Sequence, residues 1–124
     1  MITMDLTCIL TGKDFSPASA EKLTGYRFLE KNERGEIAKA GRYKGLPFPY
    51  GSCIIRDVSN QEAILDILEK YQTKLLGNGV ESIVLQLNVA YESQCNFELN
   101  ENFLARIARL SVPLSISCFE KDQT

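Results

Sequence analysis

Two long segments of the chain alternate between apolar and polar residues. Residues 3–11 and 83–91 place apolar side chains at about every second position, which is the period of a strand with one buried face. Residues 52–58 and 114–119 show the same alternation over shorter lengths, and residues 26–29 form a brief extended run. The pattern therefore predicts five strands.

Three other segments carry helix signals. Ser16, which is followed by a proline, predicts the start of a helix that ends at Gly25. Ser59 has a glutamate three residues later, the spacing of a capping box, and begins a longer amphipathic segment. Asn100 is the predicted N-cap of a third helix, which Pro113 ends.

Along the chain these elements follow the order β-α-β-β-α-β-α-β. Such an order predicts the α+β class, with helices packed on one face of a mostly antiparallel sheet. The 124 residues contain no repeat and no linker, so we expect a single domain over 1–124. The tail 120–124 is expected to fray.

Composition narrows the class of protein. The chain is 44% hydrophobic and 24% charged, which is typical of globular proteins. No apolar run approaches the ~20 residues that cross a bilayer, and the first residues lack the basic and apolar regions of a signal peptide. We therefore expect a cytoplasmic protein that does not contact a membrane.

The four cysteines are scattered along the sequence and form no C-x-x-C pair. They occupy Cys8, Cys53, Cys95 and Cys118, mostly within apolar or alternating segments. We expect buried, reduced thiols that act as small hydrophobic side chains in a reducing compartment. A disulfide framework is the alternative interpretation.

No recognisable catalytic or metal-binding motif occurs in the sequence. Histidine is absent, so a nucleophile would lack its usual base and histidine-based metal sites cannot form. Carboxylate pairs such as Glu98 with Glu101, or Asp57 with Glu62, are better explained as helix-entry and capping residues. Residues 41–45 lack the ending of a phosphate-binding P-loop. We expect no enzyme activity, no metal and no cofactor.

Charge is divided unevenly along the chain. Residues 27–44 hold six basic against three acidic residues, whereas residues 78–105 hold four acidic residues and no lysine or arginine. An acidic surface of this kind suits a basic macromolecular partner, although it is also compatible with a plain solvated surface. The mixed signs and a sequence pI of about 5.2 argue against nucleic-acid binding.

The opening segment resembles a known bacterial family. Residues 6–17, Leu-Thr-Cys-Ile-Leu-Thr-Gly-Lys-Asp-Phe-Ser-Pro, followed by Leu-Thr-Gly at 23–25, look like the first strand and helix of the family catalogued as domain of unknown function 4279. The later order of elements is similar to that family over nearly the whole chain. One departure is that the chain has no tryptophan and offers Tyr50 where such proteins tend to carry one.

The resemblance implies a role similar to that of the immunity proteins of bacterial toxin systems, including contact-dependent growth inhibition. Such antitoxin proteins are toxin inhibitors that bind one cognate toxin domain, often a basic nuclease, and occlude its active site. On this hypothesis the partner contacts are two aromatic residues and three carboxylates: Tyr91, Glu92, Phe97, Glu98 and Glu101.

A second hypothesis is a small-molecule or regulatory binding domain. Its pocket would lie under the irregular segment 30–50, with Phe48 and Tyr50 as walls.

Overall fold

The computed structural model describes residues 2–57, 60 and 62–121. Within these residues the chain forms five strands and three helices, in the order predicted from the sequence. They are β1 (Thr3–Gly12), α1 (Pro17–Thr24), β2 (Leu29–Asn32), β3 (Gly51–Arg56), α2 (Glu62–Gly77), β4 (Ser82–Tyr91), α3 (Glu101–Leu110) and β5 (Leu114–Glu120). Among them, no helix is long and apolar enough to span a membrane.

The five strands form one sheet in the order β2-β3-β1-β4-β5. The β2–β3, β3–β1 and β1–β4 pairs are antiparallel, and only β4 and β5 run parallel. A parallel pair needs a crossover connection, which here contains α3. The predicted α+β class with a mostly antiparallel sheet is therefore confirmed.

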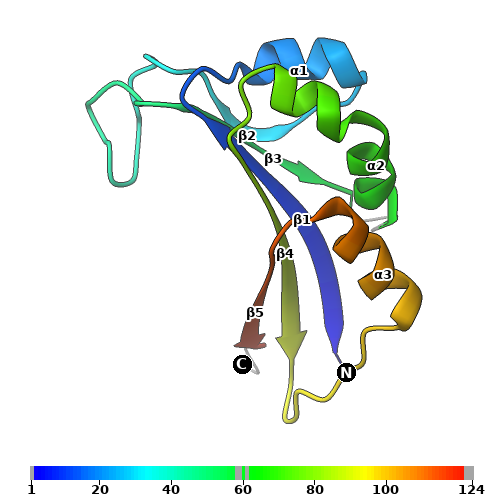
Figure 1. Cartoon of the computed structure of the whole chain (residues 1–124). Helices are drawn as coiled ribbons and strands as arrows, with labels where there is room; N and C mark the ends of the chain where they lie inside the picture. The colour runs from blue at the N-terminus through cyan, green and yellow to red at the C-terminus, as the bar shows by residue number, and fades with distance from the viewer. Residues whose placement is uncertain (1, 58–59, 61, 122–124) are drawn as a thin grey trace.

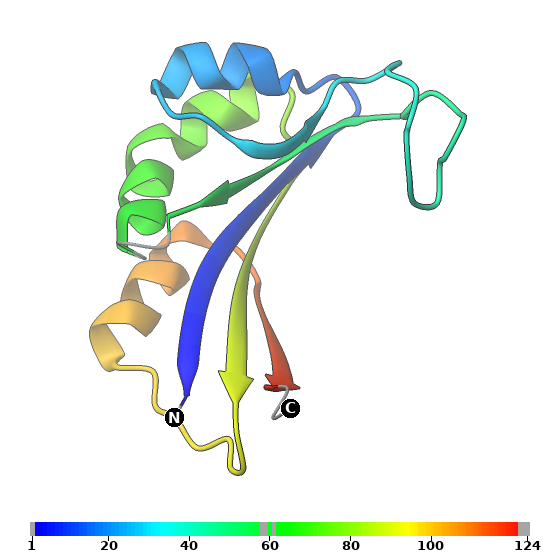
Figure 2. The same ribbon diagram turned by 180° about the vertical axis from the view of Figure 1, so that it is seen from behind.

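All three helices lie on the same side of the sheet, as predicted (Figure 1). The opposite face carries none of the described helices, and the sheet bends so that this uncovered face is concave (Figure 2). The connection between β2 and β3 projects beyond one end of the sheet. The connection between β4 and α3 lies at the other end, near the start of β1.

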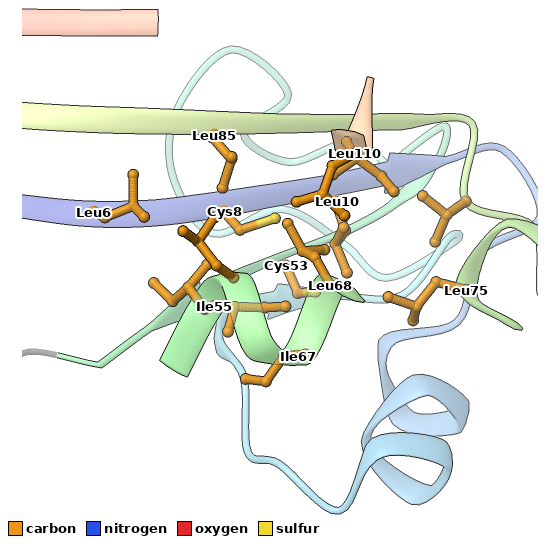
Figure 3. Packing of buried hydrophobic residues seen from close by; sticks show 14 of the residues in the cluster. Leu6, Cys8, Leu10, Cys53, Ile55, Ile67, Leu68, Leu75, Leu85 and Leu110 are labelled. Atoms are coloured by element: carbon orange, nitrogen blue, oxygen red, sulfur yellow. The ribbon is translucent and has the colours of Figure 1, made fainter. Parts of the chain in front are cut away.

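The hydrophobic core lies between the sheet and α2. Leu6, Cys8 and Leu10 of β1 are fully buried, and so are Leu68 and Leu75 of α2. Figure 3 shows these side chains meeting in one cluster. Because alternate residues of a strand point to opposite faces, the alternation of β1 and β4 directs one apolar set into this core.

Helix ends follow the sequence signals where the structure describes them. The Ser16 side chain accepts a hydrogen bond from the Ser19 amide, and Gly25 adopts a left-handed conformation with φ of 76°. The Asn100 side chain accepts from the Phe103 amide at 2.8 Å. The predicted capping residue Ser59 lies outside the described residues.

Two boundaries differ from the prediction. The extended run expected at 26–29 is displaced to Leu29–Asn32, because the Phe28 amide donates to Glu21 Oε2 at 2.8 Å instead of to a neighbouring strand. Glu120 pairs with Tyr91 in the sheet, and the Lys121 amide donates to the Tyr91 carbonyl oxygen at 2.7 Å. The start of the tail is thus ordered, and 122–124 lie outside the described residues.

The cysteine prediction is wrong for half of the set. Cys8 and Cys53 are buried, but Cys95 is only half-buried and Cys118 is exposed. Cys118 lies in an alternating segment and was therefore expected to be buried, yet β5 is an edge strand whose residues 115–120 are all exposed. The helices cover the centre of the sheet and leave this edge open.

Candidate binding face of the sheet

Five polar side chains lie together on the uncovered face. They are Asp5 and Thr7 of β1, Arg56 of β3, and Gln86 and Asn88 of β4. The sheet register pairs Thr7 with both Arg56 and Gln86, and pairs Asp5 with Asn88. Directly paired residues of neighbouring strands point to the same face, so three strands bring this set together from both halves of the chain.

Hydrogen bonds fix the polar side chains of β1 and β4. Gln86 Nε2 donates to Asn88 Oδ1 at 2.7 Å, and Asn88 Nδ2 donates to the Asp5 carbonyl oxygen at 3.4 Å. Thr7 is buried, and its hydroxyl donates to the Gln86 carbonyl oxygen at 3.3 Å. The amide side chains are therefore held in one orientation before any partner arrives.

An ion pair extends this polar set onto β3. Arg56 Nε lies 2.9 Å from Asp5 Oδ2, and the side chains are 46% and 22% exposed. The other Asp5 oxygen, Oδ1, is buried and accepts no hydrogen bond from the described residues. The Arg56 side chain remains partly exposed beside this ion pair. Its outer nitrogens can donate to an oxygen of a ligand.

Apolar side chains flank the polar set at both ends. A hollow of about 630 Å³ runs over the face, with Ile9, Ile54 and Leu29 on one side and Ala90 and Phe119 on the other. Phe119 and Leu29 are about half exposed, at 51% and 48%. Apolar area next to a few oriented polar groups is the composition of a binding site.

The predicted contact residues lie at one end of the molecule. Tyr91 ends β4, while Glu92 and Glu98 are exposed in the connection to α3, and Glu101 is the exposed first residue of that helix. Phe97 differs from the others because it is half-buried and packs against the core cluster. The structure thus brings the three carboxylates to the surface at this end and uses Phe97 as an anchor for the connection.

The basic segment 27–44 lies toward the opposite end of the molecule (Figure 2). Two of its cations are paired, since Lys31 Nζ lies 3.0 Å from Glu21 and Arg34 lies 3.1 Å from Asp14. Glu92, Glu98 and Glu101 therefore lie at the end opposite the basic segment, whereas Glu81, the fourth acidic residue of 78–105, lies beside Lys13 near the basic end.

The segment 30–50 packs its aromatic rings against one another. The Tyr43 ring lies 6.4 Å from that of Phe48 and 6.2 Å from that of Tyr50, both edge to face. Tyr50 also lines a hollow of about 600 Å³ beside Lys13 and Glu81, but Phe48 does not. Of the two expected pocket walls, Tyr50 thus lines this hollow and Phe48 does not.

Sequence reasoning missed the polar set of the uncovered face. Its members are separated by up to about 80 positions in sequence, and only the strand register makes them neighbours. One signal was present: Gln86 and Asn88 are polar residues in the middle of the strongest strand pattern. Two adjacent amides on one strand face indicate a surface that is hydrogen-bonded and half-buried rather than freely solvated.

The comparisons with known proteins found no relative of this chain. No family model, curated protein or solved structure matched the chain. The resemblance to a bacterial family stays a prediction, and the function is inferred from the geometry of the chain's own residues.

Proposed function

We propose that this chain is a binding protein that neutralises a bacterial toxin domain, and that the toxin docks on the concave, uncovered face of the sheet. The observation that carries the proposal is this face itself. It combines the hollow of about 630 Å³, flanking apolar side chains and a polar set held by internal hydrogen bonds. The protein would act in the cytoplasm as an immunity protein, by occlusion and without chemistry of its own.

Pre-arranged side chains favour binding on this face. Gln86, Asn88 and Arg56 are already oriented by contacts within the chain, so these side chains lose little conformational entropy when a partner docks. Phe119 and Leu29 add exposed apolar area at the two sides, and buried aromatic rings are frequent hot spots of interfaces.

The charge at one end supports a basic partner. Glu92 is exposed directly after β4, at the end of the sheet where Ala90 pairs with Phe119, and Glu98 and Glu101 are exposed in the following connection and at the start of α3. Negative potential at this place would attract a basic domain such as a nuclease and raise the association rate.

The first experiment co-expresses the chain with the product of the gene immediately upstream and measures co-purification and growth. In the complex, Phe119→Ala should weaken affinity about tenfold or more, since truncating a hot-spot ring costs more than ~1.4 kcal/mol. Leu76→Ala is the matched control: Leu76 is 49% exposed on α2, away from the concave face. Its affinity should be unchanged.

A second experiment tests the charge. Replacing Glu92, Glu98 and Glu101 by glutamine should lower the association rate and weaken its decrease with added salt, and replacing them by lysine should lower the rate further. If neither co-purification nor growth rescue occurs with the folded wild-type chain, the immunity proposal is wrong. The small-molecule hypothesis, with the hollow beside Tyr50, would then be the better one.

A further inference from the structure

Two cysteines meet at the edge of the sheet. Cys95 lies in the connection between β4 and α3, and Cys118 lies on β5. Their sulfur atoms are 3.8 Å apart, with the Cys95 thiol donating to the Cys118 Sγ. Cys95 is half-buried and Cys118 is exposed, so a reagent in solution can reach the pair.

We propose that Cys95 and Cys118 are a site of reversible oxidation, which forms a disulfide on reaction with low-molecular-weight disulfides such as oxidised glutathione. In a disulfide the two sulfurs are about 2.05 Å apart. Because they are 3.8 Å apart in the structure, they would have to approach each other by less than 2 Å. Cys95 lies in an irregular connection, and β5 is bonded to the sheet along one side only. Movement of either segment disturbs at most one strand pairing, so this small approach is feasible.

The reaction balances as two thiol–disulfide exchanges. The exposed Cys118 thiolate attacks one sulfur of oxidised glutathione, which forms a mixed disulfide and releases one glutathione thiolate. The Cys95 thiol then loses its proton to solvent and attacks the Cys118 sulfur, releasing the second glutathione. The two protein thiols are oxidised, and the glutathione disulfide is reduced to two thiols.

The other two cysteines provide an internal contrast. Cys8 and Cys53 are 0% and 1% exposed in the core. Burial raises the pKa of each thiol from 9.0 to about 12, which leaves almost no thiolate at neutral pH. The same chain thus carries one accessible pair and one pair shielded from reagents.

The disulfide would join the connection after β4 to the edge strand and close a loop that contains all of α3. Closing the loop between positions 95 and 118 restricts the conformations of the unfolded chain and so stabilises the fold. On the proposed function, the disulfide would also fix the connection that carries Glu98, one of the proposed partner contacts. Oxidation would then alter the affinity for the toxin, a consequence that rests on that proposal.

The experiment incubates the folded full chain with oxidised glutathione, then alkylates the free thiols and maps them by mass spectrometry. We expect two of the four thiols to be lost, with Cys95 and Cys118 recovered in one disulfide-linked peptide pair. Cys8 and Cys53 should be alkylated only after denaturation. Oxidation should also raise the midpoint of urea unfolding.

Single variants separate a true pair from general reactivity. Cys95→Ser should stop at a glutathione adduct on Cys118, and its unfolding midpoint should not rise on oxidation. A wild-type chain that keeps the same stable adduct on Cys118, or that retains all four thiols, would overturn the proposal. The readout needs no partner, so its failure is distinguishable from failure of the proposed function.

Discussion

The two faces of the sheet are built from the same strands, yet they have different properties. On the face that the helices cover, Leu6, Cys8 and Leu10 of β1 are fully buried in an apolar cluster. On the other face, Asp5 and Ile9 are only half-buried, although they alternate with those residues in the same strand. One face is thus shielded from water and the other is open, concave and partly polar.

On the proposed function, this difference separates stability from recognition. Burial of apolar area on the covered face supplies most of the driving force for folding. The uncovered face buries less apolar area and so contributes less to stability. On the proposed function, its residues are therefore freer to contact a partner. Because a shift of one residue in register would exchange the two sets, the alternation of β1 and β4 defines both roles together.

The largest expected effect compares neighbouring residues of β1. Leu10→Ala should lower the free energy of unfolding by about 2–5 kcal/mol, since the side chain is fully buried and leaves a cavity. Ile9→Ala, on the uncovered face, should cost clearly less, about 1–2 kcal/mol. Urea unfolding of both variants measures the difference. Equal losses would mean that the two faces contribute alike to stability.

The second effect concerns the thiols of the covered face at alkaline pH. Burial raises the pKa of Cys8 and Cys53 to about 12 from 9.0, so between these values the unfolded chain binds fewer protons than the folded one. Stability should therefore fall as pH rises above 9, by up to about 1.4 kcal/mol per pH unit for each thiol. Below pH 9 these thiols contribute no slope.

The control is the double variant Cys8→Ala/Cys53→Ala. Its free energy of unfolding is measured by urea denaturation at pH 8, 9 and 10, beside that of the wild type. Its stability should be lower than that of the wild type at pH 8 but should fall less steeply with pH. Parallel curves would contradict the assignment of the pH dependence to the buried thiols.

A smaller effect is expected for the ion pair of the uncovered face. Arg56→Met leaves the half-buried Asp5 carboxylate without its cation and should cost about 1 kcal/mol, because both side chains keep some contact with water. Asp5→Asn in the same background should recover part of this loss. A double-mutant cycle measures the coupling, and additive losses would show that the pair contributes nothing.

The order of the elements could be predicted because its signals are local. Alternation marks β1 and β4, while Ser16, Gly25 and Asn100 supply caps that depend only on neighbouring residues. The position of β2 was displaced because it depends on a distant contact, the pairing of Leu29 with Ile54 and of Asn32 with Ser52 in β3. Local pattern thus predicts element type better than element boundaries.

The candidate binding face could not be predicted in the same way. Alternation shows that Gln86 and Asn88 point away from the core, but not that Arg56 and Asp5 lie beside them. That requires the strand order and register. The same limit applies to Cys118, because nothing near it in the sequence shows that β5 is an edge strand that the helices leave open.

The most direct measurement of the central proposal, that a partner docks on the uncovered face, is methyl NMR of the isoleucine-labelled chain during titration with the product of the gene immediately upstream, the proposed toxin. Ile9 and Ile54 line the concave face, whereas Ile64 and Ile67 are buried in α2 on the covered side. We predict large shifts for Ile9 and Ile54 and little change for the α2 pair. Shifts confined to Ile64 and Ile67, with Ile9 and Ile54 unmoved, would contradict the account.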